Sequence, residues 1–177
     1  INRQKDEGKR AGNIVSSTIY EVSLFIELYR LYEQHCQRAA IVDFAEILLR
    51  AYELWRDNSD ILAHYQQRFT HVLVDEFQDT NTIQYAWLRQ IFTPQNNMMI
   101  VGDDDQSIYG WLGAKIENIH RLNKDFKDIV TIRLEQNYRS TSTILAAANA
   151  LISNNESRLG KELWTQGVQG ERLTLYG

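Results

Sequence analysis

The chain has 177 residues and a formal net charge of −4. Hydrophobic residues make up 44% of it and charged residues 24%, which is typical of a folded chain and excludes low-complexity disorder. The net negative charge provides no general basic field for nucleic acid, although it leaves room for a local binding groove. Because the first residue is Ile1 and not Met, we expect a piece of a longer protein.

Cysteine and histidine usage argues against two kinds of site. The only cysteine, Cys36, cannot form a disulfide within the chain and is compatible with a reducing compartment. The four histidines show no metal-ligand spacing, so a zinc site is not expected.

No run approaches the roughly 18 apolar residues that a membrane-spanning helix requires, so a membrane partner is not expected.

The first part of the chain is predicted to be helical after an irregular start. Residues 1–15 are polar and contain glycine, which indicates a loop or a frayed entry. Apolar residues then recur at intervals of about 3.6 residues and predict a helix that ends near Arg38. Thr18 and Glu21 have the spacing of a capping box at its start.

Two further helices are predicted before the first strand. Asp43 and Glu46 repeat an Asp-x-x-Glu start signal, and the apolar stripe behind them extends to Trp55. A shorter helix is predicted over residues 61–68. Aromatic side chains on these stripes are expected to be core residues.

Strands and helices alternate from about residue 71 onward. This alternation predicts a parallel sheet with crossover helices, whose polar strand ends meet at one edge. The apolar run 72–74 is typical of a strand buried on both faces of such a sheet. The predicted strands are 72–74, 98–101, 129–134 and 173–176, and the predicted helices are 83–92, 116–123 and 140–151.

A pair of acids follows the first strand. Asp75 and Glu76 stand where ligands bind in open α/β sheets, at the carboxyl end of a strand. Adjacent carboxylates there require compensation, and a hard cation such as Mg²⁺ is the usual partner. The alternative is a strand-to-helix junction in which the acids cap the next helix.

The second strand is followed by a polar turn with two aromatic residues. The run 102–107 holds three aspartates and Gln106, whose neutral amide could sense a γ-phosphate or the water beside it. The alternative for the aspartates is a solvated turn. Tyr109 and Trp111 are candidates for stacking on unpaired bases, and the alternative is packing under a loop.

A third polar cluster follows the predicted strand 129–134. Arg139 suits a planar, forked contact with a phosphate. The alternative is a surface ion pair between Arg139 and Glu135.

Three strings in order resemble the UvrD/Rep/PcrA helicases of superfamily 1, and the bacterial UvrD branch resembles the chain most. They are Val-Asp-Glu-Phe-Gln-Asp-Thr-Asn (74–81), Val-Gly-Asp-Asp-Asp-Gln-Ser-Ile-Tyr-Gly-Trp (101–111) and Leu-Glu-Gln-Asn-Tyr-Arg-Ser (134–140). The resemblance extends from about residue 14 onward. It implies an α/β fold with a partial RecA-like parallel sheet of the P-loop NTPase type and a preceding helical accessory subdomain.

The resemblance also implies a domain organisation and an activity. Residues 1–40 would belong to the accessory subdomain, residues 41–137 to the latter part of the first RecA-like domain, and residues 138–177 to the start of the second. Members of this family are ATP-driven 3′→5′ DNA translocases and helicases of repair or replication, which implies ATP and Mg²⁺ as cofactors. Single-stranded DNA, duplex junctions and repair proteins are the implied partners, and the bacterial cytoplasm is the implied location.

Site roles follow from the same resemblance. Asp75 would hold Mg²⁺, directly or through water. The residues implied to be catalytic are Glu76, which would position the hydrolytic water, and Gln106 and Arg139, which would contact the γ-phosphate. Tyr138 would stack on the adenine.

The resemblance further implies that Tyr109 and Trp111 contact single-stranded DNA. Leu112 departs from the pattern, because the family has an arginine there and a leucine cannot make a charged contact. The usual coupling between DNA and nucleotide at that point is therefore in doubt.

The chain contains no Gly-x-x-x-x-Gly-Lys-Ser/Thr loop, whose backbone and lysine would cradle the phosphates. We therefore predict that residues 1–177 alone neither hydrolyse ATP nor unwind DNA. Three other interpretations remain: the motor part of a helicase-nuclease, a non-catalytic module that binds single-stranded DNA, and a metal-dependent nuclease. The nuclease would use Asp75, Glu76 and the aspartates 103–105 around two cations.

Overall fold

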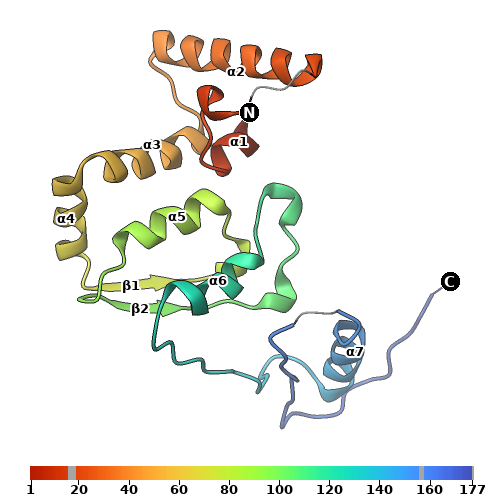
Figure 1. The fold of residues 1–177 in the computed structure, drawn as a ribbon. Helices are drawn as coiled ribbons and strands as arrows, with labels where there is room; N and C mark the ends of the chain where they lie inside the picture. Colours follow the sequence, from red (N-terminus) through yellow and green to blue (C-terminus); the bar gives the residue numbers. More distant parts are fainter. Residues whose placement is uncertain (16–18, 156–157, 177) are drawn as a thin grey trace. The chain divides into compact units, whose positions relative to one another are not determined.

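The computed structural model describes residues 1–15, 19–155 and 158–176. The chain forms two compact units, Ile1–Leu122 and Asn123–Gly177, and each is described by itself (Figure 1). The first unit contains α1 (Asn2–Asp6), α2 (Tyr20–Ala39), α3 (Phe44–Asp57), α4 (Ser59–Arg68), β1 (His71–Val74), α5 (Thr82–Ile91), β2 (Asn97–Ile100) and most of α6 (Glu117–Asp125). It also contains the short 3₁₀ helices η1 (Ala11–Asn13), η2 (Phe77–Asp79), η3 (Asp104–Gln106) and η4 (Gly110–Leu112).

The N-terminal segment is ordered and packed, so the loop predicted over residues 1–15 is wrong. It forms α1 and η1, and the Lys5 side chain is only 2% exposed. The Lys5 ammonium lies 2.7 Å from Asp43 Oδ2 and 2.9 Å from Glu46 Oε2. Polar residues suggested solvent exposure, but these acids near the start of α3 neutralise the lysine and permit its burial.

Capping side chains fix the starts of two helices. Asp43 Oδ1 accepts a hydrogen bond from the Glu46 N–H at 2.7 Å, which confirms the start predicted for α3. Asn81 and Gln84 form a reciprocal capping box at the start of α5. The capping box predicted at Thr18 lies outside the described residues, and α2 begins at Tyr20.

The two strands pair in parallel, as predicted, with α5 as the crossover between them. Val74 is paired with Ile100 at the end of the register. Both side chains pack on a core centred on three buried residues of η2 and α5, namely Phe77, Tyr85 and Leu88. This packing brings the ends of both strands onto the same support.

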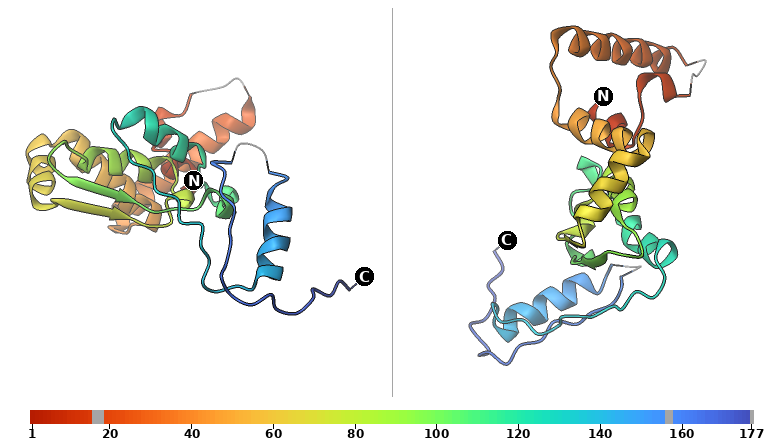
Figure 2. Two further views of the ribbon diagram at one scale, coloured as in Figure 1. Left: turned by 90° about the horizontal axis from the view of Figure 1, so that it is seen from below. Right: turned by 90° about the vertical axis from the view of Figure 1, so that its left-hand side faces the viewer.

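Only one face of the sheet is covered, so the prediction of a strand buried on both faces is wrong for this chain. Leu73 is 73% exposed and its register partner Met99 is 57% exposed. The left view of Figure 2 shows the strands in front of the helices of the first unit. Among the described elements of the first unit, none packs on this face.

The second unit contains α7 (Ser142–Ile152), which confirms the helix predicted there. The strands predicted over 129–134 and 173–176 are absent from the described residues. A strand requires a hydrogen-bonded neighbour, and the only pairing described in this unit is an isolated bridge between Gln136 and Trp164. The apolar side chains of residues 130, 132 and 134 are accordingly exposed.

Among the residues that the structure describes, no helix is both long enough and apolar enough to span a bilayer.

Candidate functional site

The parallel pairing brings two of the predicted clusters side by side. The Val101 N–H donates to the Val74 carbonyl at 2.7 Å, so the pairing continues past β2. The Phe77 N–H then donates to the Val101 carbonyl at 3.1 Å. Asp75 and Glu76 therefore leave β1 beside the segment that leaves β2, at the edge where open α/β sheets bind ligands.

Glu76 has an unusual backbone conformation, with φ 49° and ψ 42° in the left-handed region. This conformation costs a residue with a side chain about 1–3 kcal/mol, and such residues concentrate at functional sites. The Asp75 carboxylate accepts a hydrogen bond from the Glu76 N–H at 2.9 Å. Glu76 is the N-cap residue of η2 but its side chain makes no capping hydrogen bond, and Asn81 caps α5, so the alternative in which the carboxylates of these two acids cap the next helix is wrong.

A buried glutamine connects Glu76 to the end of the second strand. Gln78 is only 1% exposed, and its amide donates to Glu76 Oε2 at 2.7 Å. Its Oε1 accepts from the Asp103 N–H at 2.9 Å. The Gln106 amide in turn donates to Asp103 Oδ2 at 2.6 Å. Glu76 and Gln106 thus stand at the two ends of one hydrogen-bonded series.

Gly102 lies directly against this series. A Cβ atom at Gly102 would lie 3.0 Å from Gln78 Oε1 and 3.3 Å from Phe77 Cβ. Any side chain there would therefore displace the buried amide or the start of η2. The glycine permits the two strand ends to approach closely enough for Gln78 to bridge them.

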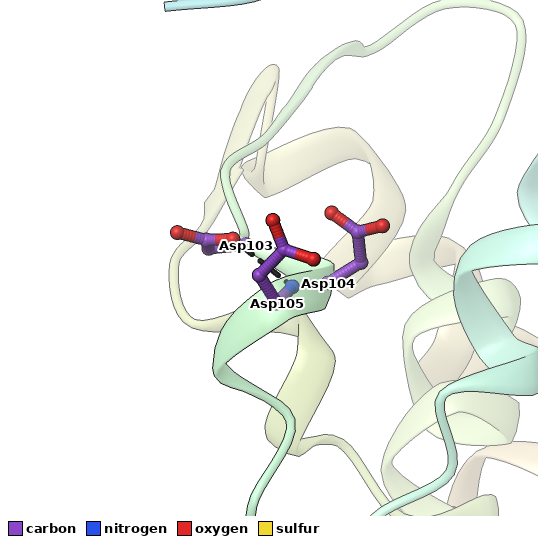
Figure 3. Close-up of side chains that lie close together, drawn as sticks. All are labelled: Asp103, Asp104 and Asp105. Carbon is purple, nitrogen blue, oxygen red and sulfur yellow. Dashed lines mark hydrogen bonds between the residues drawn. The ribbon is translucent and has the colours of Figure 1, made fainter. Parts of the chain in front are cut away.

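The three aspartates form a turn that holds itself together. Their carboxylates each offer one oxygen within 4.8 Å of the others, and Figure 3 shows the side chains leaving the turn in different directions. Asp103 Oδ1 accepts from the Asp105 N–H at 3.1 Å, the dashed line in Figure 3. Because Asp103 also accepts from Gln106, its two oxygens are both engaged in shaping the turn. This arrangement fits the solvated-turn alternative.

Asp75 and Glu76 have the donor chemistry that a hard cation requires. Both are exposed carboxylates, and Mg²⁺ in proteins is held by one or two carboxylates together with water and substrate phosphates. In the described ranges neither acid forms an ion pair with a basic side chain, so their charge is not neutralised within the chain. Asp75 and Glu76 therefore fit a magnesium-nucleotide ligand.

The aromatic candidates lie on and beside η4. Trp111 is 79% exposed, so packing under a loop does not describe it, and Tyr109 is partly exposed. Leu112 is also exposed. The segment that follows η4 is held to the segment after β1, because the Lys115 N–H donates to the Thr80 carbonyl at 2.9 Å and the buried Asn118 amide of α6 donates to the same carbonyl at 3.0 Å.

The third cluster belongs to the second unit. Asn137 Oδ1 accepts from the backbone N–H groups of Arg139 at 2.9 Å and Ser140 at 2.7 Å, which fixes a turn before α7. The exposed Tyr138 donates its hydroxyl proton to Gln136 Oε1 at 2.9 Å. No ion pair between Arg139 and Glu135 is present in the described part of this unit. The placement of Tyr138 and Arg139 against the strand ends stays a prediction.

Sequence reasoning missed the residues that hold the site together. Gln78 lies inside the first recognised string, two residues beyond Glu76, but a neutral amide gives no periodicity or charge pattern to single it out. Asn118 was assigned only to a helix. In both cases the signal is burial of a polar side chain, which the sequence alone does not show.

Comparison with known proteins gives a consistent result. The chain matches the UvrD/REP helicase N-terminal domain over residues 1–127 and the UvrD-like helicase C-terminal domain over residues 132–177. It is 60% identical to DNA helicase II of Salmonella typhimurium and 59% identical to that of Escherichia coli, each over 176 residues. It is 42% identical over 172 residues to the ATP-dependent DNA helicase PcrA of Leuconostoc citreum.

These matches cover nearly all of the chain but a minor part of each relative. The first two cover 99% of this chain and 24% of the relative, and the third covers 97% and 22%. The chain thus spans about a quarter of the length of the curated relatives it matches. Both domain matches and the three motif strings lead to one conclusion: the chain belongs to the UvrD/REP helicase family.

Proposed function

We propose that the chain is part of an ATP-dependent DNA helicase that couples hydrolysis to 3′→5′ movement along single-stranded DNA and to duplex unwinding. The observation that carries the proposal is the hydrogen-bonded series that links Glu76 to Gln106 at the edge of the parallel sheet. The printed names of the relatives, DNA helicase II and ATP-dependent DNA helicase PcrA, support the same activity.

In the proposed site the strand ends supply the hydrolytic half. Asp75 holds Mg²⁺, and Glu76 orients the attacking water and accepts its proton. Gln106 contacts the γ-phosphate from the turn after β2. Bound Mg²⁺ supplies positive charge that offsets the charge of the phosphates.

The second unit supplies the remaining nucleotide contacts. The exposed ring of Tyr138 is available to stack on the adenine, and Arg139 reaches the γ-phosphate. The turn fixed by Asn137 presents these two adjacent side chains together. Arginines that act on a transferring phosphoryl group are worth roughly 10³–10⁵ in rate, so Arg139 would be a large contribution in the intact enzyme.

DNA is proposed to contact the exposed loop around η4. Trp111 and Tyr109 are available to stack on successive bases, a mode of binding that tolerates any sequence. Leu112 places an apolar side chain on the same loop, where the family pattern has an arginine. Single strands and duplex junctions are the proposed DNA partners, together with repair proteins in the bacterial cytoplasm.

The domain assignment is part of the proposal. Residues 1–40 form part of a helical accessory subdomain, residues 41–137 the latter part of a first RecA-like domain, and residues 138–177 the start of a second. The parallel strands and their crossover helix support a RecA-like sheet. The match boundary between residues 127 and 132 supports a change of domain in this region.

ATP hydrolysis by the full-length protein that carries this chain tests the proposal. We expect Mg²⁺-dependent hydrolysis that single-stranded DNA stimulates, and its loss on Asp75→Asn. Residues 1–177 alone should show no turnover, since they lack the phosphate-cradling loop. DNA cleavage with Mg²⁺ and without ATP would instead indicate the nuclease interpretation, and it would count against the helicase proposal.

A further inference from the structure

We propose that Gln78 is a positioning residue that holds the Glu76 carboxylate in the orientation needed for hydrolysis and links it to the end of the second strand. This inference rests on the proposed function, because it assigns Glu76 the role of orienting the attacking water. Gln78 itself is 1% exposed and is not a candidate for contact with substrate. It would act only through Glu76 and Asp103.

The chemistry of the position requires a primary amide. One end of the side chain must donate to a carboxylate oxygen, Glu76 Oε2 at 2.7 Å. The other end must accept from a backbone N–H, that of Asp103 at 2.9 Å. Glutamine provides a donor and an acceptor at the end of a flexible stem, and the two neighbours leave only one orientation of its amide. Glutamate would face Glu76 with a second acceptor, and methionine would satisfy neither neighbour.

Glu76 has an unfavourable left-handed backbone conformation, so neighbouring groups must hold both its main chain and its carboxylate in place. Its left-handed backbone is maintained by the hydrogen bond from the next residue, Phe77, to the Val101 carbonyl. That bond fixes the main chain but leaves the exposed carboxylate able to rotate. The bond from Gln78 to Oε2 fixes the carboxylate, and a misplacement of about 1 Å in a reacting group can cost about 10²-fold in rate.

The link continues to the proposed γ-phosphate contact. Asp103 presents its N–H to Gln78 and accepts from the Gln106 amide through Oδ2 at 2.6 Å. A displacement of Gln106 on binding nucleotide would therefore act on the same residue that holds Gln78. The structure thus assigns Gln78 to the connection between nucleotide sensing and orientation of the water.

Gly102 offers an independent way to disturb the same amide. A Cβ at this position would lie 3.0 Å from Gln78 Oε1, a close contact that would require the amide to shift by a few tenths of an ångström. Gly102→Ala would therefore move the Gln78 amide without changing its chemistry. If Gln78 is a positioning residue, Gly102→Ala and Gln78→Met should have the same kinetic signature.

The test measures ATP hydrolysis by the full-length protein with saturating single-stranded DNA. We expect Gln78→Met to lower kcat roughly 10- to 100-fold, the usual range for residues that orient a reacting group from behind. KM for ATP and the Kd of a fluorescent ATP analogue should change less than about threefold, since the mutated side chain does not touch the nucleotide. Gln66→Met is the matched control, because the Gln66 amide donates to the Gln90 carbonyl in the same unit and away from the strand ends.

A double-mutant cycle separates positioning from general damage. In a Glu76→Gln background, Gln78→Met should lower the residual kcat less than about twofold, because its effect passes through the missing carboxylate. A 10-fold or larger loss in that background would show a merely structural role and overturn the inference. If Gln78→Met does not fold, Gly102→Ala takes its place in the test. A wild-type kcat in Gly102→Ala would then contradict the inference about Gln78.

The outcomes also distinguish this inference from the proposed function. If Glu76→Gln lowers kcat about 10²-fold or more while Gln78→Met keeps the wild-type kcat, only the role of Gln78 is wrong. If Glu76→Gln itself retains full hydrolysis, the proposed function of the strand ends is wrong and the inference fails with it.

Discussion

Two polar clusters in the first unit hold glutamates in opposite circumstances. Around Glu46, α1, η1 and α3 bring together acids and bases, and Glu46 is buried against Lys5, Arg10 and Arg50 at 2.7–2.9 Å. Around Glu76, the described neighbours are carboxylates and amides, and no basic side chain forms an ion pair with it. The first cluster is neutralised by the chain itself, and the second has no described basic side chain to neutralise it.

Charge compensation therefore distinguishes Glu46 from Glu76. The pKa of Glu46 would be raised by its burial, but hydrogen bonds and ion pairs with Lys5, Arg10 and Arg50 lower it to about 2. For Lys5, burial acts to lower the pKa, and the hydrogen bonds to Asp43 and Glu46 outweigh it so that the pKa is raised. Each partner keeps the other charged, which makes the cluster a clamp between the N-terminal segment and α3.

Replacing the central glutamate of each cluster by glutamine should give the largest contrast between the two clusters. Glu76→Gln in the full-length protein should lower the kcat for ATP hydrolysis by roughly 10²–10⁴-fold, the usual contribution of a general base. Thermal unfolding should stay within about 1 °C of the wild type, because an exposed acid without an ion pair contributes little stability and a glutamine can still accept from the Gln78 amide. Steady-state hydrolysis measures the change in kcat, and calorimetry measures the temperature of thermal unfolding. A stability loss comparable to that of Glu46→Gln would remove the contrast.

Glu46→Gln should lower the stability of the fold and leave nucleotide binding unchanged, the reverse of Glu76→Gln. Removing one partner of a buried ionic cluster leaves charge uncompensated, so α1 and α3 should lose about 3 kcal/mol of local stability. Hydrogen exchange of their backbone amides measures this loss, and the nucleotide Kd should not change. Glu27→Gln on the exposed face of α2 is the control. Equal exchange in both variants would show that the ion pairs contribute nothing to the clamp.

Acid should release the clamp over a defined pH range. The pKa of Glu46 is lowered from 4.5 to about 2 in the folded chain, so its stabilising contribution is complete above pH 4.5 and is lost as pH falls through about 2. The difference of about 2.5 pKa units corresponds to roughly 3 kcal/mol at 1.36 kcal/mol per unit. Circular dichroism between pH 5 and 2 checks the slope, which should be shallower in Glu46→Gln than in the wild type.

The smallest expected effect concerns an exposed aromatic side chain on η4. Trp111→Ala should weaken binding of single-stranded DNA by about 1–3 kcal/mol, the usual value of one base–aromatic stack. Fluorescence anisotropy with a labelled oligonucleotide measures it at fixed salt. Tyr20→Ala removes an equally exposed aromatic from the start of α2 and should change nothing. Unchanged binding in Trp111→Ala would exclude this loop from the DNA contact.

The elements that could be predicted from the sequence are those with local signals. The apolar runs at β1 and β2 predicted strands, and the pattern of α5 predicted the crossover between them. The acids after β1 and the amide at Gln106 were identified as candidate site residues because strand ends are where open sheets bind ligands. In each case the relevant residues are neighbours in the chain.

The elements that the sequence did not predict depend on distant partners. Lys5 is buried only because Asp43 and Glu46, about 40 residues later, neutralise it, so residues 1–15 looked like a solvated loop. The run 129–134 has the composition of a strand, but within the described residues it has no strand to pair with. Gln78 is a bridge between two strand ends, and neither end reveals the other in the sequence.

The uncovered face of the sheet has a practical consequence for anyone who produces residues 1–177 by themselves. Leu73 and Met99 present adjacent apolar side chains to water, and the sheet has only two strands among the described residues, so both of its edges there keep unpaired backbone groups. Removing such a surface from water is favourable, and a second copy of the same strands is an available partner. Dilute samples or a solubilising fusion would keep the chain monodisperse during purification.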